Sequence, residues 1–188
     1  QRAHGRSGGN TMSFGILERY DCRQWAEYIL QRFGYDTKIV LYGISMGAST
    51  VLMALSLKLP KQVVGVIADS PFSSPGAIIR KVCADIRFPP PIIYPFVVLG
   101  GMLFGRFRIW EMNCQKAVKE ARIPILLIHG GDDRFVPKQM SEVIADAAPK
   151  ARMEIFPDAG HVLSYVSDEK RYRDLIQEFI GYCVKNEE

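Results

Sequence analysis

The residues that could do covalent chemistry begin with a serine between two glycines, in the stretch Gly43-Ile44-Ser45-Met46-Gly47. An apolar, β-branched run precedes this stretch and a helix-forming run follows it, so the sequence predicts a strand, a sharp turn and a helix, with Ser45 at the apex. We expect a side chain in place of either glycine to collide with the strand or the helix. A serine in such a turn has a strained backbone and an exposed hydroxyl. Ser45 is therefore a candidate nucleophile.

Groups that could activate this serine follow it in the chain. A hydroxyl of normal acidity is a poor nucleophile, so it needs a base, and the base needs a carboxylate to orient it. Asp132 and Asp133 lie in the loop that follows the apolar run 125–129, and His161 lies in the loop that follows the run 152–156. An acid and then a base, each at the end of a later strand, is the order expected behind a serine of this kind. The pattern indicates acyl transfer to a serine.

Alternating strands and helices must position these groups. The patterns predict strands at 38–43, 63–69, 125–129 and 152–156, and helices at 15–33, from the serine turn to about 58, at 137–147 and at 168–185. This alternation indicates an α/β fold, with a parallel sheet, right-handed crossovers and flanking helices. Ligands of such sheets bind at the carboxyl ends of the strands, where the candidate groups lie.

The segment between the second and third strands is longer than one crossover helix requires. It covers 70–124 and contains the apolar run 92–105. We expect a small helical cap inserted over the site, at about 71–120. The run has 14 residues and contains Pro95, whereas crossing a membrane takes about 20 residues. A membrane span is therefore disfavoured, and contact with a membrane surface is a secondary expectation.

Composition narrows the function classes. A chain of 188 residues, 48% hydrophobic and 23% charged, is expected to form one soluble globular domain over 1–188. A net charge of +4, with no basic run interleaved with aromatic residues, disfavours nucleic-acid binding. The cysteines are widely spaced, so we expect reduced thiols rather than a disulfide framework or a metal site: Cys22, Cys83, Cys114 and Cys183.

Three motifs together resemble the α/β-hydrolase superfamily. They are Gly-Ile-Ser-Met-Gly, then His-Gly-Gly-Asp-Asp-Arg-Phe-Val-Pro, then Ala-Gly-His, in that order along the chain. The chain is most similar to bacterial serine esterase or peptidase-like members that carry a short helical cap. The resemblance implies that Ser45 is the nucleophile, Asp133 the acid of the triad and His161 the general base.

The family pattern also ranks the remaining acids and histidines. It favours Asp133 over Asp132, because the family's acid stands three residues before the valine of the second motif. Asp69 remains an alternative acid, since some members of the superfamily take theirs from the preceding strand. His129, at a strand end, is expected to bond local backbone. His4 lies in a loop that in relatives helps to shape the floor of the site, and we expect neither histidine to be the base.

The resemblance implies a mechanism without a metal or an organic cofactor. His161 takes the proton of Ser45 as the hydroxyl attacks a carbonyl carbon, and water then hydrolyses the acyl-enzyme. The backbone N–H of Met46 would donate one hydrogen bond to the oxyanion. The expected function is a serine hydrolase that cleaves a small ester, with a small-molecule ester as substrate.

The start of the chain resembles the loop that follows the family's fourth strand. We therefore expect a domain that is incomplete at its N-terminal side, without the loop that supplies the second oxyanion donor. The strand 38–43 would then be an unpaired sheet edge through which two copies could associate. A non-catalytic fragment or assembly module is accordingly the main alternative function, and a peptidase or membrane-associated lipase is a further one. No signal peptide is visible, so a cytoplasmic location is expected, with an anchor or signal before residue 1 left open.

Overall fold

The computed structural model describes residues 1–185, so 186–188 of the expected domain lie outside the described residues. At its centre is a parallel sheet in the order β1-β2-β3-β4. The strands are β1 (Ile39–Ile44), β2 (Val63–Asp69), β3 (Ile125–Gly130) and β4 (Ala151–Phe156). All candidate groups of the sequence analysis lie at the carboxyl ends of these strands.

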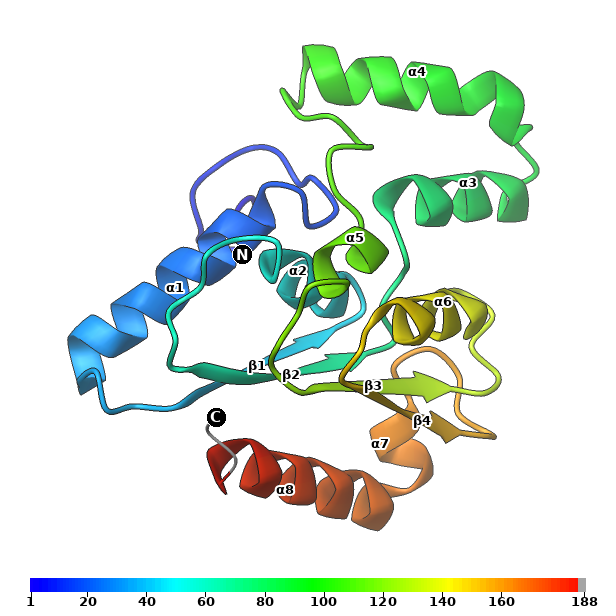
Figure 1. The fold of residues 1–188 in the computed structure, drawn as a ribbon. Helices are drawn as coiled ribbons and strands as arrows, with labels where there is room; N and C mark the ends of the chain where they lie inside the picture. The colour runs from blue at the N-terminus through cyan, green and yellow to red at the C-terminus, as the bar shows by residue number, and fades with distance from the viewer. Residues whose placement is uncertain (186–188) are drawn as a thin grey trace.

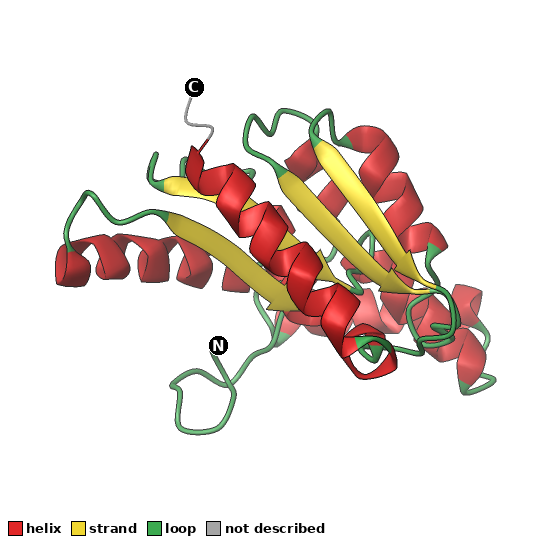
Figure 2. Cartoon of the chain, turned by 90° about the horizontal axis from the view of Figure 1, so that it is seen from below, coloured by secondary structure: helices red, strands yellow, loops and turns green. Residues whose placement is uncertain are grey.

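Helices cover both faces of the sheet (Figure 1). One face carries α1 (Glu18–Phe33), α2 (Met46–Ala54), α5 (Cys114–Val118) and α6 (Gln139–Ala147). The other face carries α7 (Ser164–Ser167) and the long α8 (Glu169–Lys185), which crosses in front of the strands in Figure 2. The predicted α/β fold is confirmed.

Burial follows from the position of each strand in the sheet. Every residue of β2 and of β3 is buried, because both strands have a neighbour on each side and helices above and below. The strand β1 lies at one edge and pairs only with β2 among the described residues, and its Tyr42 and Ile44 are exposed. The apolar strands therefore form the core, which continues into α2 on one face and α8 on the other.

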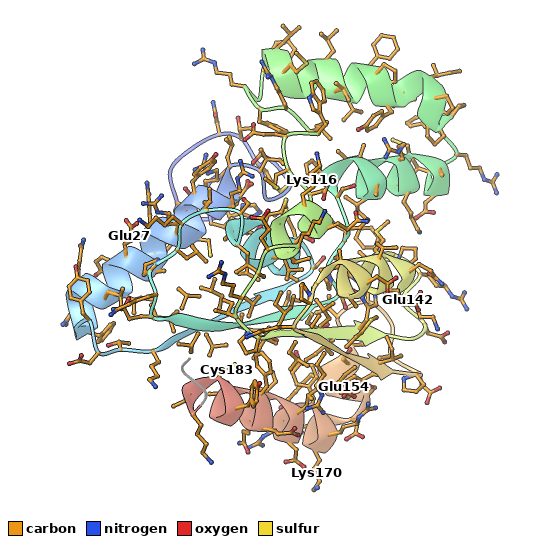
Figure 3. All side chains as sticks on the ribbon, viewed as in Figure 1. Glu27, Lys116, Glu142, Glu154, Lys170 and Cys183 are labelled. Carbon is orange, nitrogen blue, oxygen red and sulfur yellow. The ribbon has the colours of Figure 1, made fainter. Side chains whose placement is uncertain are left out.

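The packing of α8 depends on a small residue in the sheet. A Cβ added to Gly65 would come within 3.0 Å of the Cys183 sulfur, so the thiol occupies the space that a side chain would need. Figure 3 shows Cys183 on the side of α8 that faces the sheet. The described cysteines, Cys22, Cys83, Cys114 and Cys183, are all free thiols.

Two further helices stand away from the sheet, in the segment where the sequence predicts an insertion. They are α3 (Pro75–Asp85) and α4 (Pro90–Leu103), and we refer to them as the cap helices (Figure 1, top). Ser74 caps the start of α3 by accepting the Ala77 N–H, and the Arg80 guanidinium lies 4.6 Å from the centre of the Tyr94 ring on α4. Within residues 1–185, no helix has the length and apolar character needed to cross a membrane.

The helix after the serine turn is shorter than predicted. It was expected to reach about residue 58, but α2 ends at Ala54. The following N–H groups of Leu55, Ser56 and Leu57 each bond to the carbonyl three residues earlier, and the Ser56 hydroxyl also bonds to the Met53 carbonyl. Such bonds tighten the backbone into a 3₁₀-type turn and end the α-helix.

Only one of the two glycines around Ser45 has the predicted steric role. A Cβ on Gly43 would come within 3.0 Å of the backbone of Gly47, which confirms the prediction for Gly43. A Cβ on Gly47 would meet no heavy atom within 4 Å beyond its chain neighbours and the backbone of its own helix, so the prediction for Gly47 is wrong. Only position 43 must lack a side chain, because the Gly47 carbonyl lies where a Gly43 Cβ would be, whereas the space beside the Gly47 α-carbon is open.

This difference predicts unequal effects of two alanine substitutions on the free energy of unfolding. Gly43→Ala should lower the free energy of unfolding by about 3 kcal/mol, because the added methyl meets rigid backbone. Gly47→Ala should change it by less than about 1 kcal/mol, since alanine favours the helix. Urea unfolding followed by circular dichroism measures both. Equal losses of stability in the two variants would contradict the structure.

Candidate active site

Ser45 lies at the apex of the turn from β1 into α2, with φ 52° and ψ −115°. A non-glycine residue with positive φ costs on the order of 1–3 kcal/mol and persists only where its surroundings fix it. Here its backbone N–H donates to the carbonyl of Asp69 at 2.8 Å, and Gly43 allows the chain to turn back closely. The strained turn presents the serine hydroxyl beyond the end of the sheet.

Three side chains from three different loops form one hydrogen-bonded series. The Ser45 hydroxyl lies 2.9 Å from Nε2 of His161, and Nδ1 of the same ring lies 2.7 Å from Oδ2 of Asp133. Both distances lie within the range for proton transfer between a nucleophile, a base and an orienting acid. The Asp133 carboxylate can only accept a hydrogen bond, so Nδ1 of His161 carries the proton that it donates to Asp133. Nε2 of the same ring is then free to accept the proton of the Ser45 hydroxyl. The structure thus brings together the three residues that the motifs indicate.

Hydrogen bonds hold the carboxyl group of Asp133 in its ionised form. Oδ1 accepts the backbone N–H groups of Phe135 at 3.0 Å and Val136 at 2.8 Å, and Oδ2 faces ring nitrogens of His161 and His129. Burial raises the pKa of this carboxyl, but the bonds from His129, His161 and Val136 outweigh it and hold the pKa well below its usual value. The acid beside His161 is therefore a carboxylate at neutral pH.

The buried ring of His129 lies next to the carboxylate of Asp133. Its fully buried ring places Nε2 at 2.8 Å from the Val136 carbonyl and 3.3 Å from Oδ2 of Asp133, and Nδ1 at 2.6 Å from the Ser141 hydroxyl. The carbonyl only accepts, so Nε2 carries the proton and Ser141 donates to Nδ1. The expected bond to local backbone is confirmed, but the sequence analysis missed the contact with Asp133. The spacing of four residues between His129, near the end of β3, and Asp133 was the available signal.

The loops that carry Asp133 and His161 lie backbone against backbone. A Cβ on Gly130 would come within 3.0 Å of the Ala159 carbonyl oxygen, and one on Gly131 would come equally close to Pro157. The Asp132 N–H also donates to the Ala159 carbonyl at 3.0 Å. The two glycines before the acid therefore allow the two loops to meet.

The hydrogen bonds of the described His161 ring go to Ser45 and Asp133, and the other candidate acids and the remaining histidine have other partners or are exposed. Asp132 is exposed, and the buried Asp69 accepts from the Ser70 hydroxyl at 2.9 Å and the Tyr172 hydroxyl at 2.8 Å. His4 is exposed and bonds to a backbone carbonyl two residues away. Within residues 1–185, no three His, Cys, Asp or Glu side chains gather where they could hold a metal ion.

Further backbone strain surrounds the site. Besides Ser45, positive φ angles occur at Phe14 (55°), Ser70 (54°) and Val162 (61°). Val162 directly follows His161, and a β-branched residue in this region is a clear outlier. Strained residues of this kind concentrate at functional sites because surrounding contacts must enforce them. No sequence motif signalled the strain at Val162.

Met46 occupies the first position of α2. The N–H groups of a first helical turn have no acceptor inside the helix, and the helix dipole places partial positive charge there. The Met46 N–H is therefore available to a negatively charged oxygen next to Ser45, as the motif predicts.

An apolar cavity of about 320 Å³ lies beside Ser45. This volume falls in the range of small-ligand sites. Its walls come from the segment before α1, the start of α2, the helices α3 and α4, and the loops at the strand ends: Phe14, Ser45, Met46, Phe72, Ile78, Ile79, Val82, Cys83, Val97, Phe135 and Val136. The Phe135 ring also contacts the His161 ring, with centres 5.0 Å apart. The nucleophile thus borders a space suited to an apolar group, and the base contacts Phe135 in its wall.

Comparison with known proteins places the chain among hydrolases. Residues 1–175 match the sequence model of the Alpha/beta hydrolase family. The uncharacterized protein YqkD of Bacillus subtilis is 29% identical over 182 residues, which cover 95% of this chain and 59% of that protein. The uncharacterized protein Rv2307c of Mycobacterium tuberculosis is 26% identical over 181 residues, covering 95% and 57%. The chain thus spans less than two thirds of the length of these relatives.

Crystal structures of hydrolases are similar to the chain as well. Esterase Pf2001 of Pyrococcus furiosus has a TM-score of 0.67 and 25% identity, covering 96% of this chain and 68% of that protein. A lipase-esterase related protein of Clostridium acetobutylicum has a TM-score of 0.67 and 19% identity, covering 94% and 79%. The fold and the matching family model lead to the same conclusion: this chain belongs to the alpha/beta hydrolase family.

Proposed function

We propose that the chain carries the site of a serine hydrolase that cleaves a small carboxylic ester through an acyl-enzyme on Ser45. The observation that carries the proposal is the hydrogen-bonded series from Ser45 through His161 to Asp133, beside an apolar cavity. The similarity to an esterase at 25% identity supports an ester as the substrate class.

The proposed reaction begins when Nε2 of His161 removes the proton of the Ser45 hydroxyl. The oxygen attacks the ester carbonyl carbon, and the Met46 N–H stabilises the resulting oxyanion. The imidazolium is stabilised by the Asp133 carboxylate and gives its proton to the leaving alcohol. Water then attacks the acyl-enzyme with the same histidine as base, which regenerates the serine and releases the acid.

The cavity favours an acyl chain over a peptide. A peptide would bring N–H and C=O groups that need partners when buried, at a cost of about 1–3 kcal/mol for each group left unpaired. The cavity walls are almost wholly apolar, from cap residues such as Ile79, Val82 and Val97. An ester with a short apolar acyl group meets this lining without such a cost.

The non-catalytic alternative rests on a separate observation, the position of β1 at the sheet edge of the described residues. An edge strand with free backbone groups can pair with another chain. The alternative requires only the fold, whereas the hydrolase proposal requires a reactive serine. Reactivity of Ser45 therefore distinguishes the two.

A fluorophosphonate probe provides this test. The intact chain should form a covalent adduct at Ser45, because the neighbouring imidazole makes the hydroxyl nucleophilic. Ser45→Ala should abolish the adduct and lower the turnover of p-nitrophenyl butyrate by about 10⁴-fold or more. Mass spectrometry locates the adduct, with Ser7→Ala as a control, because Ser7 is an exposed serine outside the cavity wall. A folded protein without an adduct would overturn the proposed hydrolase.

Neighbouring aspartates allow a paired test of the acid. Asp133→Asn should lower turnover by about 10⁴-fold, because an amide cannot hold the productive tautomer of His161. Asp132→Asn should leave turnover within about twofold, since the Asp132 side chain is exposed. Steady-state hydrolysis of p-nitrophenyl butyrate compares the two variants. Similar losses in both would contradict the assignment of Asp133.

The depressed pKa of Asp133 predicts a pH effect on stability. A carboxyl whose pKa is lower in the folded than in the unfolded state stabilises the fold above its unfolded value, about 3.9. This stabilisation is lost as the pH falls from about 4 toward the folded pKa. The difference in unfolding free energy between the wild type and Asp133→Asn should therefore narrow on acidification from pH 6 to pH 3. A gap that stays constant in urea titrations over this range would contradict the depressed pKa.

A further inference from the structure

The outer face of α4 is apolar and exposed. The helix contains no charged residue, and none of its residues is fully buried. The large side chains on its outer face recur at helical spacing and continue into the residue after the helix: Ile92, Phe96, Leu99, Leu103 and Phe104. Phe96 is 69% exposed and Phe104 is 85% exposed. We refer to these five residues as the α4 ridge.

The opposite face of α4 already has a function in the fold. Its Ile93, Tyr94, Val97 and Val98 pack against the buried core, and Val97 also lines the cavity beside Ser45. Figure 1 shows α4 as the outermost element at this end of the molecule, with α3 between it and the sheet. The α4 ridge is thus convex apolar surface that nothing in the described part of the chain covers.

Positive charge borders this surface at both ends. The segment 86–110 contains three arginines and no aspartate or glutamate. Arg87 precedes α4 and Arg106 and Arg108 follow it, and all three are exposed. Two exposed aromatic residues, Phe88 and Trp110, lie beside them in the chain. The surface therefore combines an apolar centre with a basic and aromatic border.

We propose that the α4 ridge inserts into the surface of a membrane that contains anionic lipids. Helices that lie in the membrane interface bury an apolar face at the boundary of headgroups and acyl chains, with basic residues toward the lipid phosphates. Tryptophan side chains, such as that of Trp110, are enriched at the same depth. The helix lies in the plane of the interface and does not cross the bilayer.

Charge argues against a second copy as the occupant. If two ridges packed together antiparallel, Arg87 of one copy would approach Arg106 and Arg108 of the other, and a parallel pair would bring identical arginines together. Either arrangement places like charges side by side with no acid from 86–110 to compensate. The ridge side chains also offer no hydrogen-bonding groups, whereas protein interfaces carry about ten direct hydrogen bonds. A lipid surface requires neither acids nor directional bonds.

The test compares two phenylalanines of equal exposure. Phe96 on the ridge is 69% exposed, and Phe33 at the end of α1 is 68% exposed. All proteins carry Ser45→Ala, so binding is measured without lipid hydrolysis and does not depend on the proposed activity. The probe is a vesicle of phosphatidylcholine and phosphatidylglycerol in which about one lipid in three is the anionic phosphatidylglycerol. Co-sedimentation of the protein with these vesicles gives the partition coefficient. Phe96→Ser should weaken binding about tenfold, and Phe33→Ser should leave it unchanged.

A second pair of variants tests the basic border. Replacing Arg87, Arg106 and Arg108 by glutamine should weaken binding to the anionic vesicles by about 10²-fold. The matched control replaces the exposed Lys58, Lys61 and Lys150, which lie toward the amino ends of the strands, and removes the same charge. Binding to the control variant should stay within about threefold of the parent.

Three outcomes would overturn the proposal. The first is no binding of the parent protein to anionic vesicles. The second is an equal effect of Phe96→Ser and Phe33→Ser, which would show that exposed apolar area in general causes the binding. The third is a concentration-dependent dimer in sedimentation velocity that Phe96→Ser dissociates, which would make a second copy the occupant of the ridge.

Discussion

The approach of two loops at the end of the sheet determines the whole site. The backbone at Gly130 and Gly131 touches the backbone of 157–160, and any side chain at either glycine would push these loops apart. Asp133 follows one loop and His161 ends the other, so their 2.7 Å hydrogen bond exists only because this contact is backbone on backbone. Parallel pairing of β3 with β4 brings the two loops to the same edge of the sheet. Because Gly130 and Gly131 have no side chains, the backbones of the two loops can come into contact.

The serine is fixed by a separate but analogous constraint. Its strained conformation is held by the hydrogen bond from its N–H to the Asp69 carbonyl and by the close fit of Gly43 against the start of α2.

The cap helices lie on the apolar side of the site, and each face of α4 has a separate role. Its inner face borders the cavity, while its outer face carries the ridge. A small rotation of this helix would therefore alter the acyl cavity and the outer surface together.

The sequence predicted the parts of the molecule that depend on local pattern. Apolar runs located the strands, and the order of the motifs predicted that Ser45, Asp133 and His161 meet at one edge of the sheet. What escaped prediction depends on tertiary contacts. The free space at Gly47 and the contact of His129 with Asp133 depend on the three-dimensional path of the backbone. The end of α2 was missed because weak i→i−3 bonds leave no signal in residue type.

Asp133 illustrates a consequence for the energetics of charge transfer. Its oxygens accept the N–H groups of Phe135, Val136 and His161, and Nε2 of His129 lies 3.3 Å from Oδ2. In the proposed reaction the imidazole becomes positive, and in water the surrounding dipoles would have to turn to accommodate that charge. Here the dipoles around its counter-ion are already oriented and cannot turn. The reorganisation that solvent would undergo at every turnover took place once, when the chain folded.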